Sequence, residues 1–297
     1  MTRLVIRALD AHDAALFDTL PDPLGLAAAH ARTVHRPEWK RVALRDGVVV
    51  ARGAWWGGPD DTTPVNINWF DVAEGEEEAG AALLRTAPHR VELELDLPAG
   101  WRGSPVTRAA GETRLRAARA AGYEVLAERY LYHWTPRCGL PERPGRLRFR
   151  PEADDAVFFD ALRRIHSDTL DAHARRAVAE GGLDQAAQEE LDFFRWCPSP
   201  RRWWQVAHTP GGEFVGIHVP AHNPGGPCIG FIGVVPEQRG RGYSLDLLAE
   251  CTHFLAERGA QLVKGATDQA NVPMARNFAR AGHPVAAERI SLVPGRG

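Results

Sequence analysis

An internal repeat constrains the fold of this chain more than any other feature of its sequence. The residues LVIR at 4–7 are answered by LRFR at 147–150, and a predicted helix follows each stretch. Toward the end of each half, AGYEVLAER at 121–129 matches AGHPVAAER at 281–289. Because chance would readily supply only one such match, two matches in the same order indicate that one α/β unit has been duplicated.

The predicted elements follow the same order in both halves: a strand, a helical stretch, a strand–turn–strand, another strand, a helix, a strand, a helix and a final strand. Between the halves, residues 135–145 contain three prolines and two glycines, which interrupt helices and central strands. We therefore predict two tandem mixed α/β domains at 1–137 and 146–297, joined by a linker at 138–145.

Composition narrows the class of protein. The 297 residues carry a formal charge of −2. The chain therefore lacks the overall positive charge that would attract nucleic acid or an anionic membrane. No apolar run approaches the roughly 20 residues of a membrane-spanning helix, and the N-terminus lacks the apolar stretch of a signal peptide. The four cysteines lie far apart without CxxC spacing, which argues against a zinc knuckle or a disulfide framework. We expect a soluble, cytoplasmic protein.

One segment of the second half has the pattern of an anion site. The apolar strand 228–235 is followed by QRGRGYS at 238–244 and by a helix whose apolar face is Leu247, Leu248, Cys251, Phe254 and Leu255. A helix N-terminus leaves about four backbone N–H groups unpaired and suits an anion. Glycines let the backbone approach it, and arginines add charge. Taken alone, such a turn is equally typical of a tight strand-to-helix connection.

A second motif makes the segment specific. VVPEQRGRGYS at 234–244 resembles the acetyl-CoA loop of the Gcn5-related N-acetyltransferases (GNATs), R/Q-x-x-G-x-G/A, with Arg239 first, Gly242 fourth and Ser244 in place of the usual glycine or alanine. NVPMARNFARAGH at 271–283 resembles the N-x-x-A-x-x-x-Y-x-x-x-G-F helix of the same family. The resemblance implies two tandem GNAT-like α/β (α+β) domains, each with a mixed, mostly antiparallel sheet flanked by helices.

The resemblance also implies a site for acetyl-CoA, which serves as a co-substrate. Val234 and Val235 would offer backbone groups to the pantetheine arm, and the N–H of Val235 would stabilise the oxyanion. Asn271 and Phe278 would flank the pantetheine or the thioester. The residues expected to cradle the pyrophosphate are Gln238, Arg239, Gly240, Arg241, Gly242, Tyr243 and Ser244.

The catalytic groups are less defined. Phe278 stands where many family members have a proton-donating tyrosine, and the strand 228–234 contains no carboxylate. His218 and Asp268 are candidate catalytic residues. The alternative for His218 is a core or surface histidine, and the alternative for Asp268 is a turn-stabilising carboxylate.

A group of potential metal ligands occurs early in the second half: His166, Asp168, Asp171 and His173. No third ligand is obvious for the two histidines, so an exposed helix face is the favoured interpretation and no metal is predicted. In GNATs the early helices often form a wall of the acceptor site, so these residues are also candidates for substrate selection.

The first half differs at the position of the phosphate loop. When Val72 is aligned with Val234, Glu77 falls where Arg239 sits, with three further glutamates beside it. These carboxylates would occupy the anion site and repel pyrophosphate. We expect a degenerate first domain that does not bind coenzyme A and that is structural or forms a wall of the acceptor pocket.

These inferences predict an N-acetyltransferase that moves an acetyl group from acetyl-CoA to a primary amine of a small molecule by direct attack. The alternative is a non-catalytic acyl-CoA-binding sensor or scaffold, which the missing tyrosine and strand carboxylate would suit. Protein acetylation is a third option, disfavoured because a second domain would crowd the cleft. We expect a monomer that is a pseudo-dimer by duplication, or a weak homodimer.

Overall fold

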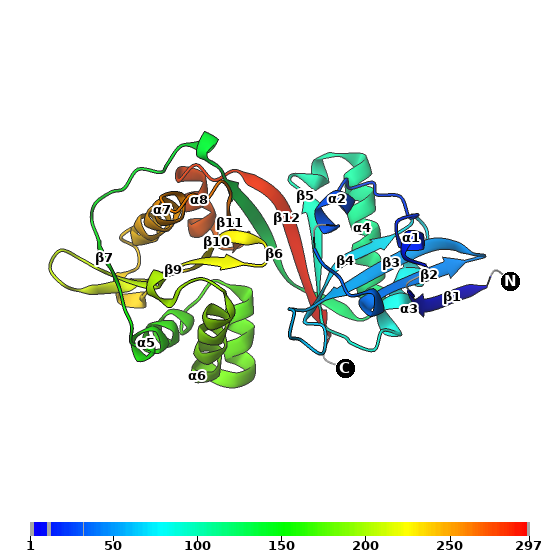
Figure 1. The fold of residues 1–297 in the computed structure, drawn as a ribbon, viewed down its shortest axis with the longest axis horizontal. Helices are drawn as coiled ribbons and strands as arrows, with labels where there is room; N and C mark the ends of the chain where they lie inside the picture. The colour runs from blue at the N-terminus through cyan, green and yellow to red at the C-terminus, as the bar shows by residue number, and fades with distance from the viewer. Residues whose placement is uncertain (1–2, 11–12, 32, 296–297) are drawn as a thin grey trace. The chain divides into compact units, whose positions relative to one another are not determined.

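The computed structural model describes residues 3–10, 13–31 and 33–295, and the chain divides into two compact units (Figure 1). Unit 1 comprises Met1–Arg129 with Ala287–Gly297, and unit 2 comprises Tyr130–Ala286. The predicted linker at 138–145 lies inside unit 2. The chain changes unit within two strands, β6 (Tyr123–Trp134) and β12 (Val285–Pro294).

Unit 1 contains a seven-stranded sheet in the order β1-β2-β3-β4-β5-β12-β6. Neighbouring strands from β1 to β4 run antiparallel, β4 and β5 run parallel, and β5 and β12 run antiparallel. The remaining elements are β1 (Leu4–Ala8), α1 (Ala14–Phe17), α2 (Ala27–His30), β2 (Lys40–Arg45), β3 (Val48–Trp56), β4 (Asn66–Val72), α3 (Glu77–Arg85), β5 (Glu92–Pro98) and α4 (Pro105–Ala120).

Helices α3 and α4 cover the main core of unit 1. Their buried side chains, such as Leu83, Leu84 and Leu115, pack with the inward residues of β3, β4 and β5. The alternating burial of β5, with Leu93, Leu95 and Leu97 inside, is the period-2 pattern of a strand with one face on a core.

The last strand of the second repeat completes the sheet of the first. In unit 1, β12 lies between β5 and β6, with Ala287 opposite Pro98 and Leu292 opposite Leu93. Arg289 of β12 forms ion pairs with Glu94 and Asp96 of β5. Pairing between distant strands, which local sequence does not reveal, therefore sets the boundaries of the compact units.

Unit 2 has the strand order β12-β6-β11-β10-β9-β8-β7. β7 to β10 pair antiparallel in sequence, whereas β10 and β11 run parallel. The mixed, mostly antiparallel sheet flanked by helices is thus confirmed. The remaining elements are β7 (Arg148–Pro151), α5 (Asp155–His166), α6 (Ala172–Trp196), β8 (Gln205–His208), β9 (Phe214–Asn223), β10 (Gly226–Val234), α7 (Tyr243–Ala256), β11 (Val263–Asp268) and α8 (Val272–Arg280).

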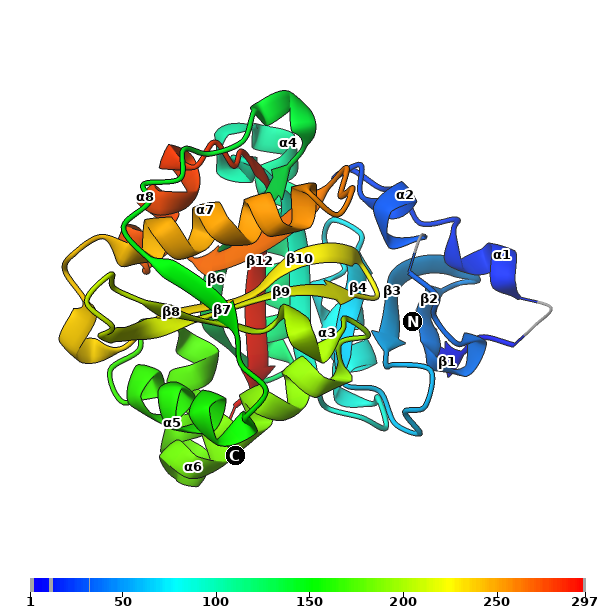
Figure 2. The same cartoon turned by 60° about the vertical axis from the view of Figure 1, so that its left-hand side comes forward.

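Two helix layers sandwich the sheet of unit 2, with α5 and α6 on one face and α7 and α8 on the other (Figures 1 and 2). Phe158, Leu191 and Phe194 belong to the core under α5 and α6. Leu247 and Leu248 of α7 pack on the opposite face. The whole predicted apolar face of α7 is buried, as the helical spacing indicated.

The parallel strands β10 and β11 separate soon after they meet. Their one registered pair is Cys228 with Lys264, although β10 continues to Val234 and β11 to Asp268. On its other side, β10 has an irregular register between Ile229 and Phe231. A Cβ on the intervening Gly230 would lie 2.7 Å from the carbonyl oxygen of Val219, so this bulge requires glycine.

No helix in residues 3–10, 13–31 and 33–295 is long and apolar enough to cross a membrane. All four cysteines are free, and three of them, Cys197, Cys228 and Cys251, are buried.

Candidate functional site

The glycine loop joins the end of β10 to the start of α7. Gly240 and Gly242 have φ angles of +77° and +78°, in the left-handed region that favours glycine, and Gly242 is the N-cap of the helix. A Cβ on Gly240 would meet nothing within 4 Å, so this part of the loop is open. The first turn of α7 therefore presents backbone N–H groups at an accessible helix N-terminus, the arrangement that suits an anion.

A cavity of about 560 Å³ lies at this helix N-terminus. Its lining includes Gly240, Arg241 and Gly242 of the loop, Arg280 of α8 and Arg146 from the segment before β7. Arg241 and Arg280 are exposed, and within the described residues neither guanidinium has a hydrogen-bond or ion-pair partner. These two arginines and the helix N-terminus outnumber the one carboxylate in the lining, that of Glu142, so the cavity favours an anion.

Arg146, which sequence reasoning did not single out, holds the loop in place. It donates hydrogen bonds to the carbonyl oxygens of Arg241 (2.9 Å) and Gly242 (3.2 Å) and forms an ion pair with buried Asp246 of α7. The ion pair raises the pKa of Arg146 through its hydrogen bond to Asp246. No sequence signal marks this residue, because its role depends on the path of the segment after β6.

Arg239 and Gln238 turn inward. The Arg239 guanidinium donates to the carbonyl oxygens of Val234 (3.1 Å) and Ile165 (2.9 Å) and pairs with the Asp168 carboxylate (3.0 Å). Gln238 is buried. Arg239 therefore ties the loop to the end of α5, and Arg241 is the loop arginine that faces the cavity.

The backbone of β10 corrects one expectation. The Val235 N–H donates to the carbonyl oxygen of Val215 (3.0 Å) on the β9 side, so it is not the free oxyanion donor that was predicted. Backbone groups alternate sides along a strand. The N–H groups of Val234 and Ile232 therefore point away from β9, into the opening where β11 has separated.

Helix α8 is fixed at its start and joined to the loop. Asn271 is its N-cap and accepts a hydrogen bond from the Met274 N–H (3.3 Å). Asn277, another residue that the sequence did not single out, donates to the Ser244 hydroxyl (2.8 Å). This contact ties the middle of α8 to the first turn of α7.

Phe278 is buried and stacks on Tyr132 of β6, with ring centroids 4.1 Å apart and planes 6° from parallel. Burial raises the pKa of Tyr132 to about 12, so its phenol stays protonated at neutral pH. Phe278, at the family's tyrosine position, therefore packs in the core, and the phenol that lies against it comes from Tyr132 of β6.

His218 is a core residue. It is fully buried, its Nε2 lies 3.0 Å from the Gln205 side-chain oxygen, and its ring meets Phe149 edge-on. Burial lowers the pKa of His218 to about 3. Such an imidazole is neutral and weakly basic at pH 7, which favours the core alternative over a catalytic base.

Asp268 lies at the end of β11 and is buried. Its carboxylate accepts a hydrogen bond from the Ala172 N–H (2.7 Å) at the start of α6, and its carbonyl accepts one from the Asn271 N–H (3.0 Å). Asp268 thus stabilises the turn before α8, as its structural alternative proposed, and it also anchors α6. One carboxylate oxygen of Asp268 lies within 4.8 Å of a carboxylate oxygen of Asp171 and of an imidazole nitrogen of His173.

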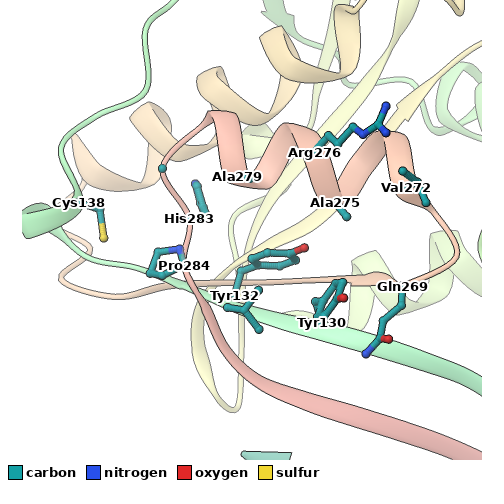
Figure 3. A pocket seen from close by; sticks show the side chains of 12 residues that line it. Tyr130, Tyr132, Cys138, Gln269, Val272, Ala275, Arg276, Ala279, His283 and Pro284 are labelled. Atoms are coloured by element: carbon teal, nitrogen blue, oxygen red, sulfur yellow. The ribbon is translucent and has the colours of Figure 1, made fainter. Parts of the chain in front are cut away.

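A larger cavity of about 810 Å³ lies along the other side of α8 and contains none of the predicted site residues (Figure 3). Val272, Ala275 and Ala279 form its helix wall, and the rings of Tyr130 and Tyr132 lie below them. It has the size of a small-molecule site. The chemistry of phosphate recognition points to the smaller cavity, where the arginines and the helix N-terminus meet.

Comparisons with known proteins agree with this geometry. Residues 161–283 match the model of the Acetyltransferase (GNAT) family. The chain is similar to a GCN5-related N-acetyltransferase from Sphaerobacter thermophilus, with 18% identity, a TM-score of 0.54 and coverage of 99% of this chain and 97% of that one. It is also similar to the GCN5-related glucosamine N-acetyltransferase region of a fungal multi-domain GH3 beta-N-acetylglucosaminidase, with 13% identity, a TM-score of 0.55 and coverage of 98% and 38%. No curated protein matches.

The solved structures show a GNAT-type fold, and the family model matches the part of the chain that contains the glycine loop. At these identities the solved structures establish the fold, and they do so over nearly the whole chain. The family match adds that residues 161–283 carry a GNAT-type acetyltransferase domain, and the GNAT family uses acetyl-CoA as a co-substrate.

Proposed function

We propose that unit 2 binds acetyl-CoA and transfers its acetyl group to a primary amine of a small molecule by direct attack in a ternary complex. The observation that carries the proposal is the cavity at the α7 N-terminus, where Arg241 and Arg280 lie beside a glycine N-cap and have no partner among the described residues. The pyrophosphate would bind the N–H groups of the first turn of α7 and these two guanidinium groups.

The opening between β10 and β11 supports a place for the pantetheine arm. An extended chain with amide groups can pair with backbone that no neighbouring strand occupies. The N–H groups of Ile232 and Val234 point into this opening and replace Val235 as the proposed oxyanion donors. Ser244 and Asn277 would hold α7 and α8 together beside the arm.

Isothermal titration calorimetry with acetyl-CoA tests the binding step. Arg241→Glu should weaken affinity about 10- to 100-fold, since it replaces a favourable charge with a repulsive one near the pyrophosphate. Arg276→Glu is the matched control, because Arg276 is an exposed arginine of α8 that lines the other cavity. Equal effects of the two variants, or no binding by the wild-type protein, would refute this site.

A non-catalytic acyl-CoA sensor is the second candidate, and the packing of Phe278 favours it. No tyrosine occupies that position on α8, and β10 carries no carboxylate. Free-thiol release on a panel of aminosugars, amino acids, polyamines and aminoglycosides separates the two candidates. Turnover of any amine excludes the sensor, whereas binding without turnover supports it.

A further inference from the structure

The turn between α5 and α6 is fixed at both ends to the two strands that separate. At one end, Arg239 joins the carbonyl oxygen of Ile165 in α5 to that of Val234 at the end of β10. At the other end, the Ala172 N–H that begins α6 donates to Asp268 at the end of β11. The turn therefore spans the opening between β10 and β11 from the helix layer opposite α7 and α8.

A compact group of ionisable side chains lies at the second attachment. Ligand atoms of Asp171, His173 and Asp268 all lie within 4.8 Å of one another. Asp268 is 3% exposed, whereas Asp171 and His173 are partly exposed, so the imidazole stands beside a buried carboxylate with access from solvent. Asp171 also caps α6 through the Ala174 N–H (2.9 Å), which fixes its orientation.

His166 is an independent sign that this turn is built to meet a ligand. It ends α5, it is 4% exposed, and within the described residues neither of its ring nitrogens has a hydrogen-bond partner. Burial lowers its pKa, and Asp171 partly opposes that effect. Its ring lies edge-on to Phe231 of β10, 6.3 Å between centroids. A buried polar group left without a partner is rare and calls for one.

We propose that Asp171, His173 and Asp268 form the acceptor-amine site, in which His173 is the general base and Asp268, whose carboxylate lies within 4.8 Å of the imidazole, is the positioning residue. This inference rests on the proposed function, because it places the acceptor across the β10–β11 opening from coenzyme A. Two carboxylates would attract the acceptor as an alkylammonium ion. The cluster supplies the base that β10 lacks.

The chemistry balances without any further reactant. His173 removes one proton from R–NH3⁺, and the freed nitrogen lone pair forms the N–C bond to the thioester carbonyl. The C–S bond then breaks and its electron pair leaves on the coenzyme A sulfur. The second nitrogen proton goes through solvent to that thiolate, and the imidazolium returns its proton to water. The products are the N-acetyl amine, free coenzyme A and one proton.

The test compares His173→Gln with His89→Gln, a control histidine in unit 1. Both variants should bind acetyl-CoA as the wild-type protein does. Thiol release on the best amine of the panel should fall at least about 100-fold at pH 7 in His173→Gln. The rate of thiol release by this variant should recover as the pH approaches the pKa of the amine, because the amine then loses its proton without a base. The acidic limb of the pH–rate profile therefore moves to higher pH. Asp171, Asp268, His166, Asp168 and Arg239 are the charged or titratable groups around the turn that shape this profile.

Asp268→Asn tests the positioning role and should give a smaller loss with the same direction of pH shift. Since Asp268 anchors α6, thermal unfolding checks that the Asp268→Asn variant is folded. Asp171→Asn provides a second variant. Unchanged activity and pH profile in His173→Gln would overturn this inference alone. Acetyl-CoA binding without turnover in the wild-type protein would overturn both the acceptor-site inference and the proposed transferase function. Loss of turnover after dialysis against EDTA, restored by Zn²⁺, would identify a metal site instead.

Discussion

The two units differ in charge at the N-terminus of the corresponding helix. In unit 2, α7 begins at an αL glycine beside unpaired Arg241 and Arg280. In unit 1, α3 begins among glutamates, and these are neutralised locally: Glu76 pairs with Arg45 and Glu77 with Arg116. A helix N-terminus that already holds its own carboxylates offers nothing to a pyrophosphate.

The two units also differ in the side chains buried next to these helices. In unit 1, Arg114 of α4 donates to the Phe70 carbonyl (3.1 Å) and to Asp71 of β4 (2.9 Å), and Arg52 also pairs with Asp71 (2.7 Å). All three ionic side chains are buried. Charged side chains therefore occupy the contact between β4 and α4, whereas the end of β10 has no registered pair with β11. The two units therefore differ in side-chain charge at corresponding positions, which agrees with our expectation that only unit 2 binds the cofactor.

The largest expected effect follows from breaking the buried ion pairs. Asp71→Ala leaves Arg52 and Arg114 without their carboxylate and should lower the free energy of unfolding by about 3–5 kcal/mol. Chemical denaturation measures the loss, with exposed Asp60→Ala as the control. A loss below about 1 kcal/mol would mean that the ion pairs do not hold unit 1 together.

Acid should destabilise unit 2 more strongly than unit 1, in which burial also lowers the pKa of His30 and His35 but by less. Burial lowers the pKa of His218 to about 3 and that of His283 to about 4, so below pH 6.5 the unfolded chain binds protons that the folded unit 2 does not. Each of these groups removes about 1.4 kcal/mol of stability per pH unit between 6.5 and its folded pKa. Burial alone would raise the pKa of Asp71, but Arg114 and Arg52 outweigh it and lower that pKa, so unit 1 loses this contribution only as the pH falls below 3.8.

Hydrogen exchange at pH 5 and pH 7, corrected for intrinsic rates, resolves the two units. Peptides of α7 should lose more protection between pH 7 and pH 5 than peptides of α4. Equal loss in the two units would contradict the assignment of the strongest acid-sensitive groups to unit 2.

A matched pair of glycines separates strain from binding. Gly240 and Gly75 have φ angles of +77° and +78°, each just before the corresponding helix, and a Cβ at either position meets nothing within 4 Å. Valine at either position should cost about 1–2 kcal/mol of stability. Gly240→Val should also weaken acetyl-CoA binding about 10-fold, as measured by calorimetry, whereas Gly75→Val should leave it unchanged.

The smallest expected effect is a charge reversal in unit 1. Glu77→Arg should create no second acetyl-CoA site, because the Arg114–Asp71 pair still fills the contact between α4 and β4. Calorimetry should report one site per chain for the variant and for the wild-type protein. A stoichiometry of two would show that the glutamates alone distinguish the units.

Sequence reasoning reached the local features of the candidate site and missed those that depend on distant segments. The Gly240–Gly242 turn, the apolar face of α7 and the N-cap Asn271 follow from residue type and spacing over a few positions. Arg146 and Asn277 could not be found this way, since each acts on a segment more than 30 residues away. The inward turn of Arg239 was also invisible, because a motif gives no side-chain direction.

The sequence by itself determined the mixed α/β fold class, and it predicted a duplication and a phosphate-type turn at 238–244, because repeats and helix-terminus chemistry are local. Only the tertiary structure decided that β12 completes the sheet of unit 1, that the Val235 N–H is already used, and that Asp171, His173 and Asp268 meet. These features arise from pairing and packing between residues far apart in the chain. Many pairings satisfy the same local pattern, and burial of the whole core selects one of them.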